Sequence, residues 1–424
     1  MKDHSLVTTL KSLRGNPRGC VYTEPLWGIP FNLYIPLASL YMVALHVTYE
    51  QIGLIAGIGT GFQVIMALLS GVITDRLGRR RTTLIFDIVS WSVPALISAI
   101  AQNFWFFLIA AIVNSVWRVT QNSWTCLLVE DAEPEQLVDI YSWIYISNQL
   151  VGFVAPLAGV LMGAFSLIPT MRGLYLFAAV MFTVKAITTY RMTRETGQGT
   201  VRLHETKHQS SLVVLRGYGP VLGELLRTPQ TLYTAGIMLV LSIGALISGN
   251  FWAILVTQKL QVPEMYVTYF PFLRSAVMIA FFFLVMPRIG ALPFRLPLVA
   301  GFLLYVISQV LLITAPVQGY GLLIASVFLE ACSYATVAPL VDRLTALTIE
   351  PKERARIQSI LYVGIILLTT PFGFIAGWLF TLDQNLPFFL NMALFGIGAL
   401  LAYLAGKAAA RALAAGPGPA EVSV

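Results

Sequence analysis

The sequence predicts an all-α polytopic membrane protein with twelve transmembrane helices, and three observations indicate this fold class. Hydrophobic residues make up 57% of the 424 residues and charged residues only 11%. A soluble domain carries roughly 25% charged residues, so this chain has too few charges to cover a surface in water. Twelve apolar stretches each approach the roughly 20 residues that a helix needs to cross a bilayer, and the cations gather on one side of them.

The predicted spans follow the chain as two groups of six. They cover about residues 25–46, 52–73, 82–101, 104–126, 140–163, 172–190, 232–257, 267–286, 296–314, 319–341, 356–380 and 386–405. The longest polar stretch separates the sixth span from the seventh. We therefore expect the following organisation: an N-terminal arm 1–24, a six-helix bundle 25–190, a linker 191–228, a second six-helix bundle 229–405 and a tail 406–424.

The distribution of Lys and Arg predicts the orientation. Of 27 such residues, only Arg172 and Lys259 fall on one side, and Arg118, Lys185 and Arg274 lie within spans. The rest lie in the termini and loops of the other side. Because cations near span ends resist translocation, that side is expected to be cytoplasmic, in the cell membrane, with both termini there. The formal charge of +7 thus reflects topology and predicts no nucleic-acid partner.

The two groups of six also echo one another. An offset of 212 residues carries Arg118 onto Glu330, and an offset of 217 carries Tyr145 onto Tyr362. These matches favour two pseudo-symmetric bundles, an architecture that places a binding site between the halves near mid-membrane. We expect a monomer embedded in lipid.

The loop between the second and third spans carries the most specific motif, Gly-Val-Ile-Thr-Asp-Arg-Leu-Gly-Arg-Arg-Arg at residues 71–81. It resembles the loop between the second and third helices of the major facilitator superfamily, whose members are solute carriers. The resemblance implies the major facilitator fold. It also implies that Asp75, Arg76, Gly78 and Arg79 act as a latch across the halves in the outward-facing state.

The residue types in this loop suit a latch. Gly71 would let backbones approach closely and Gly78 would permit a tight turn. Asp75 could cap a neighbouring helix, and Arg79 and Arg80 could pair with acids at the end of the fourth span. The alternative is that the cations only fix topology. The predicted cytoplasmic lock comprises Gly71, Asp75, Arg76, Gly78, Arg79, Arg80, Glu130 and Asp131.

Small residues four apart mark two further helices. Gly53, Gly57 and Gly61 lie on one face of the second span, and Gly373 and Gly377 do the same in the eleventh. Such spacing lets membrane helices pack closely.

Charged residues within the spans are candidates for proton coupling, because each costs at least about 2.5–3.5 kcal/mol at the bilayer centre. Arg274 and Glu330 both lie near mid-membrane and could pair. Protonation of Glu330 would break that pair, as a proton-coupled carrier requires, although a static structural pair is equally compatible with the sequence.

Arg118 begins the sequence Arg-Val-Thr-Gln, which resembles the Arg-x-x-Gln of the fourth helix in the family's drug:proton antiporters. Asp87 and Glu24 are its predicted counter-ions. Two departures weaken the likeness to that branch: Asn122 replaces the usual glycine, and the fifth span lacks two glycines around Pro156.

Aromatic and amide side chains in the first, fourth, fifth and seventh spans predict the solute. Such a mixture suits a small amphipathic or ring-shaped organic compound. The candidates are Trp27, Phe31, Asn32, Tyr34, Asn114, Trp117, Gln121, Asn148, Gln149, Asn250 and Trp252. There is no dense cationic cluster for phosphate esters and no membrane histidine for metal ions. The scattered Cys20, Cys126 and Cys332 suggest no disulfide or metal framework, and no cofactor is expected.

The favoured function is therefore a secondary transporter that exports a small amphipathic solute in exchange for protons. The alternative is a symporter or facilitator for uptake of a sugar or related nutrient. A membrane enzyme or sensor is disfavoured, because no nucleophile–base pair is evident and no large soluble domain is present.

Overall fold

The computed structural model describes residues 13–132, 136–205, 229–289, 295–348 and 354–414. Within these residues it contains 12 helical spans long and apolar enough to cross a membrane. The predicted all-α fold class and the twelve predicted spans are therefore confirmed.

The first half of the chain contains six spans, four of them built from more than one helical segment. Their elements are α2 (Gly15–Tyr34), η1 (Ile35–Leu37) and α3 (Ala38–Ala44); α4 (Tyr49–Leu77); α5 (Arg79–Asp87), η2 (Ile88–Ser92) and α6 (Val93–Ala99); α7 (Phe104–Asn114) and α8 (Trp117–Val129); α9 (Leu137–Leu150), η4 (Val151–Val154) and α10 (Pro156–Phe165); and α11 (Leu167–Met192). The short helix α12 (Gly197–Glu205) follows.

The second half contains the other six spans. Their elements are α15 (Pro229–Gln258); α16 (Glu264–Val267), α17 (Tyr269–Leu284) and α18 (Met286–Ile289); α19 (Arg295–Thr314); α20 (Tyr320–Thr348); α21 (Arg354–Leu382); and α22 (Leu386–Ala414).

Proline explains where several spans change geometry, because it lacks an N–H donor and its ring clashes with the preceding turn. Pro36 lies in the 3₁₀ turn η1, and Pro94 and Pro156 follow the irregular segments η2 and η4. Asn114 supports the second of these breaks, since its side-chain amide donates to the Ser90 carbonyl at 2.7 Å.

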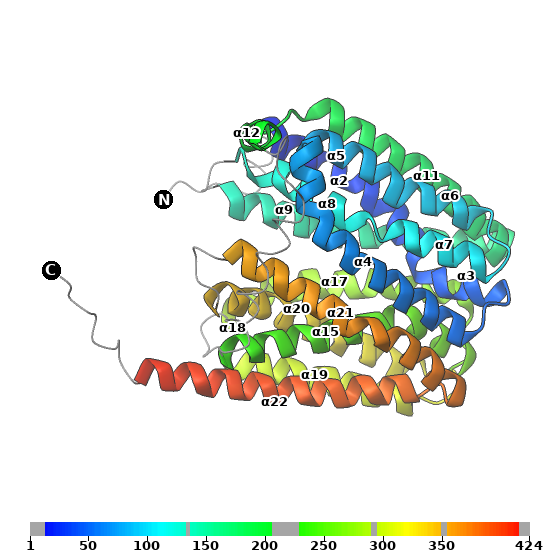
Figure 1. Ribbon diagram of the computed structural model, residues 1–424. Coiled ribbons are helices and arrows are strands. Elements are labelled where there is room, and N and C mark those ends of the chain that lie inside the picture. The colour runs from blue at the N-terminus through cyan, green and yellow to red at the C-terminus, as the bar shows by residue number, and fades with distance from the viewer. Residues whose placement is uncertain (1–12, 133–135, 206–228, 290–294, 349–353, 415–424) are drawn as a thin grey trace.

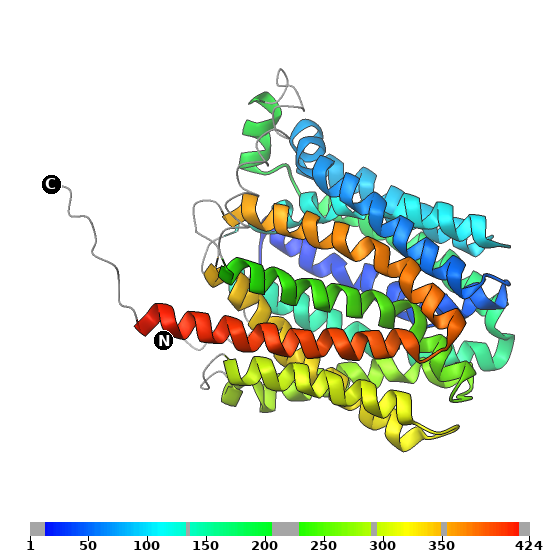
Figure 2. The same cartoon turned by 60° about the horizontal axis from the view of Figure 1, so that its bottom comes forward.

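The two halves lie side by side, with the first described residues of α2, helix α12 and the last of α22 at the same end of the molecule (Figure 1). We call this the basic end, since the turn between α4 and α5 with its three arginines lies there, and the opposite end the far end. Figures 1 and 2 both show α4 and α21 converging toward the far end and diverging toward the basic end.

Close glycine packing joins the halves at the far end. A Cβ atom on Gly373 would lie 2.8 Å from the Cα of Gly57, and one on Gly377 would lie 3.1 Å from the Cα of Gly53. No side chain fits there without moving a backbone, so the close packing predicted from small residues four apart is confirmed, and the structure shows that the second span packs on the eleventh. A second seam joins α10 to α16, where a Cβ on Gly159 would lie 2.6 Å from the Met265 carbonyl oxygen.

The structure corrects two predicted boundaries. The first span begins at Gly15 and not near residue 25, because this stretch packs into the first half: Cys20 is fully buried and the Thr23 hydroxyl lies 2.7 Å from that of Thr189. The last helix continues to Ala414, beyond the predicted end at residue 405. Alanine-rich sequence there has high helix propensity.

Candidate functional site

The predicted lock forms a compact ionic cluster around Arg79 at the basic end. The Arg79 guanidinium lies 2.8 Å from an Asp75 carboxylate oxygen and 3.2 Å from one of Glu130. Only 5% of the Arg79 side chain is exposed, although it carries a full charge. All three residues belong to the first half, so in this conformation the cluster ties α4, α5 and α8 to one another and not to the second half.

Glu195 completes this cluster, a role that was not predicted. Its two carboxylate oxygens accept the backbone N–H groups of Arg79 and Arg80 at 2.9 and 3.1 Å. These N–H groups lie at the positive N-terminus of α5, where they have no partner within the helix. Glu195 can reach them because Gly78, with a φ of 82°, turns the chain before α5 begins. The Thr196 hydroxyl donates to Glu130 at 2.5 Å. The predicted linker therefore contributes to the lock.

Three lock predictions are wrong. Arg80 pairs with neither predicted acid: its guanidinium lies 3.8 Å above the Tyr190 ring and donates to the Tyr190 carbonyl at 2.9 Å. Asp131 accepts from the Asn16 amide at 3.0 Å, not from an arginine. A Cβ on Gly71 would meet nothing within 4 Å, so this glycine allows no close approach of backbones.

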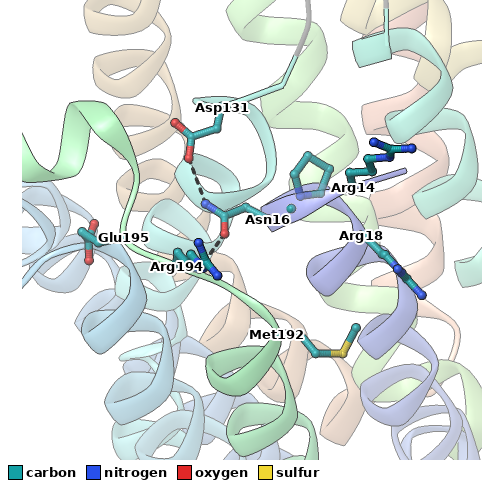
Figure 3. Close-up of a pocket in the computed structure, with 9 residues that line it drawn as sticks. Arg14, Asn16, Arg18, Asp131, Met192, Arg194 and Glu195 are labelled. Carbon is teal, nitrogen blue, oxygen red and sulfur yellow. Dashed lines mark hydrogen bonds between the residues drawn. The ribbon is translucent and has the colours of Figure 1, made fainter. Parts of the chain in front are cut away.

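A pocket of about 520 Å³ opens beside this cluster, between the start of α2 and the end of α11. Figure 3 shows Asn16 in its wall, bonded on one side to Asp131 and on the other to the backbone N–H of Arg194 at 2.7 Å. The pocket belongs to the first half alone, and Arg14 and Arg18 also line it.

A buried ion pair lies deeper in the first half. Lys185 of α11 contacts Asp87 of α5 at 2.5 Å, with 6% and 2% of the two side chains exposed. Glu24 of α2 also interacts electrostatically with Lys185. The prediction that Asp87 and Glu24 are counter-ions of Arg118 is therefore wrong, because Asp87 pairs with Lys185 and Glu24 lies near the same lysine.

Arg118 lies at the start of α8, near the middle of its span, and half-buried. Its Nε donates to the side-chain oxygen of Gln63 at 3.1 Å, and one Nη donates to that of Gln121 at 3.0 Å. The guanidinium lies 4.0 Å above the Trp117 ring. Among the described residues, no carboxylate lies within ion-pair distance of it.

The predicted pair in the second half does form, but loosely. Arg274 of α17 lies 3.8 Å from Glu330 of α20, which is beyond hydrogen-bond distance. The Arg274 side chain is 41% exposed and that of Glu330 is 17% exposed. Arg274 also lies 5.1 Å from the centre of the Tyr334 ring.

The two mid-span sites are related by the internal repeat. Tyr362 of α21 lies near Arg118 from the opposite half, and Tyr145 of α9 lies near Arg274 in the same way. Tyr145 and Tyr362 are the residues that the offset of 217 aligns. Each half thus presents a charged site to a tyrosine of the other half, which places both sites where the halves face one another.

The predicted substrate residues fall into three groups. Trp27 and Phe31 stack at 4.6 Å and both contact Trp91, whose ring lies 6.4 Å from that of Trp117. Gln121 and Gln149 lie beside Arg118 and Tyr145. The remaining residues lie elsewhere. Asn148 is on an exposed face. The others make contacts within their own half: Tyr34, Asn32, Asn114, Asn250 and Trp252.

Sequence reasoning missed Gln63, Trp91, Lys185, Tyr334 and Glu195. Gln63 and Lys185 had a usable signal, since each is a polar side chain inside an apolar span. Trp91 and Tyr334 had none, because Trp and Tyr are largely apolar side chains and do not stand out within an apolar span.

A family model described as the Major Facilitator Superfamily matches residues 27–295. The chain belongs to this superfamily. It is accordingly a multi-pass membrane protein and a secondary transporter of small solutes, and not an enzyme. No curated protein matches the sequence.

Solved structures of transporters share its fold. The nucleoside transporter NupG has a TM-score of 0.68 at 12% identity, over 92% of this chain and 98% of that one. A POT family transporter in complex with a thioalcohol-conjugated peptide also has a TM-score of 0.68, at 11% identity, over 95% and 99%. The human organic anion transporter MFSD10 has 0.61 at 18% identity, over 91% and 99%. These likenesses show the fold alone.

Proposed function

We propose that this transporter couples export of a small amphipathic organic solute to protons moving inward, by alternating access. The observation that carries the proposal is the loose Arg274–Glu330 pair, 3.8 Å apart and partly exposed near mid-span. A tight buried pair would be a structural tie. A carboxylate that is accessible and held by one distant cation can instead gain and lose a proton during each cycle.

Glu330 is the proposed proton site. The charged and titratable groups around it are Arg274 of α17, Tyr305 of α19 and Tyr334 of its own helix. Protonation would remove the attraction that holds Arg274 toward α20. Because Arg274 also interacts with Tyr145 of the first half, releasing it would change a contact between the halves.

The proposed cycle takes the basic end as cytoplasmic, following the distribution of Lys and Arg. The far-end glycine contact then makes the present conformation inward-facing. In the outward-facing state we propose that α4 and α21 separate at the far end while the Asp75–Arg79–Glu130 lock bridges the halves at the basic end. Uptake of a nutrient by symport remains the alternative direction of coupling.

Transport in vesicles with an imposed pH gradient tests this function. An inward proton gradient is expected to drive export of an amphipathic organic solute found by screening, and Glu330→Gln is expected to abolish that coupling while solute exchange persists. The control Glu50→Gln removes an exposed acid at the far end and should change neither.

Two results would contradict the proposal. Gradient-driven transport that survives Glu330→Gln would show that the proton binds elsewhere. Movement of the solute in the same direction as the protons would mean that the protein is a symporter and not a proton-coupled exporter.

A further inference from the structure

We infer that Arg118 binds the anionic group of the transported solute, and that this solute is an organic carboxylate with a flat apolar body. The inference rests on the transport function proposed above and names the substrate class of the same central site.

Two of the three cations inside the membrane spans have acidic partners. Lys185 contacts Asp87 and interacts with Glu24, and Arg274 pairs with Glu330. Arg118 has no such acid among the described residues. An uncompensated charge near mid-membrane is costly, so a site that keeps one through folding is expected to use it for a ligand of opposite charge.

The Arg118 guanidinium is held by two uncharged side chains. The side-chain oxygens of Gln63 and Gln121 fix its orientation at 3.1 and 3.0 Å but carry no charge. They use one hydrogen on Nε and one on Nη and leave the other donors for a ligand. A planar guanidinium matches a carboxylate with two parallel hydrogen bonds. A single cation favours a monoanion over a phosphate ester, which would need several.

An aromatic wall beside the Arg118 guanidinium would bind the apolar body of the solute. The Trp117 ring lies under the guanidinium at 4.0 Å and continues through Trp91 to the stacked pair of Trp27 and Phe31. Trp117, Trp91, Trp27 and Phe31 are each half-buried. A flat aromatic ring beside the carboxylate would pack on this wall by the offset or edge-to-face contacts that aromatic groups prefer.

The internal repeat supports the same assignment. The offset of 212 aligns Arg118 with Glu330, so the two halves present opposite charges at equivalent positions. In the second half the charge has a partner within the protein, Arg274, and a proton can replace that partner. In the first half, the anionic group of the solute would be the partner of Arg118. Tyr362, 41% exposed and facing Arg118 from α21, would let a bound anion contact both halves.

Equilibrium binding to the purified full chain in detergent tests this inference without any gradient. The probes are phenylacetate, 4-phenylbutyrate and indole-3-acetate, each compared with its neutral primary amide by titration calorimetry. At least one acid is expected to bind about tenfold or more tightly than its amide, as a charge-assisted hydrogen bond implies.

Three variants locate the effect. Arg118→Gln is expected to remove the preference for the acid, while Arg118→Lys keeps the charge and retains part of it. Arg172→Gln makes the same chemical change near the start of α11, at the far end of the molecule, and should leave the preference for the acid intact. If Arg118→Gln does not fold, the unchanged protein and Arg118→Lys still decide the question.

The inference is overturned if none of the three acids binds better than its amide, or if the preference survives in a folded Arg118→Gln. Glu330→Gln should keep the preference. Loss of proton coupling in Glu330→Gln vesicles therefore tests the proposed function, whereas loss of acid selectivity in Arg118→Gln tests the substrate class.

Discussion

Replacing Lys185 with methionine is expected to lower the free energy of unfolding by about 3–5 kcal/mol, the cost of breaking a buried ion pair from one side. The lysine lies 2.5 Å from Asp87, and both side chains are almost fully buried between α5 and α11. Methionine has a similar length, so the change removes the charge with little loss of packing. It leaves the buried Asp87 and the half-buried Glu24 without a cation. The unfolding temperature in detergent measures the effect.

A second variant separates the charge effect from packing. Asp87→Asn combined with Lys185→Met removes both charges of the pair and is expected to be more stable than Lys185→Met alone, because position 87 no longer carries a buried uncompensated charge. As a matched control, Arg202→Met breaks the exposed pair with Glu205 on α12 and should cost at most about 1 kcal/mol. Equal losses in the buried and exposed variants would contradict the reading of Lys185 as the counter-ion of Asp87.

Gly373→Ala is expected to shift the protein away from the conformation described above. The new methyl carbon would lie 2.5 Å from the backbone nitrogen of Gly57 and 2.8 Å from its Cα, so α4 and α21 must separate at the far end. Overpacking of this kind costs typically about 1–3 kcal/mol, which corresponds to roughly a 5–150-fold change in the equilibrium between two conformations. Spin labels on Gln102, between α6 and α7, and on Val317, between α19 and α20, would report a longer distance between the halves at the far end.

Gly364→Ala on the same helix is the matched control, because its methyl group would meet nothing within 4 Å. Both changes raise the helix propensity of α21 by the same amount. A similar far-end distance in the two variants would mean that the glycine contact does not hold the halves together. Transport should fall in Gly373→Ala and persist in Gly364→Ala.

Much of the fold was predictable because it depends on local sequence. Runs of apolar residues mark the spans wherever the chain must use lipid as its solvent, and glycines four apart predicted that the second and eleventh spans pack closely on neighbouring helices. The pairing of Arg79 with Glu130 was predictable for a related reason: two basic-end loops of neighbouring spans must lie close together.

The errors concern contacts whose direction the sequence does not specify. α11 is apolar all round, so its pattern does not indicate which neighbour Lys185 faces, and its partner Asp87 lies 98 residues away. Glu195 caps α5 from a distance of 116 residues. The first span begins ten residues early because polar groups such as Thr23 find partners inside the bundle, which a hydropathy window cannot detect.

The most direct test of the two-bundle account measures both ends of the molecule in the same sample conditions. In a background without the three native cysteines, one spin-label pair would join Arg81 and Arg288 at the basic end, and another would join Gln102 and Val317 at the far end. Between acid and alkaline pH, the account predicts that one distance lengthens as the other shortens. Distances that change together, or that stay fixed under all conditions, would contradict it.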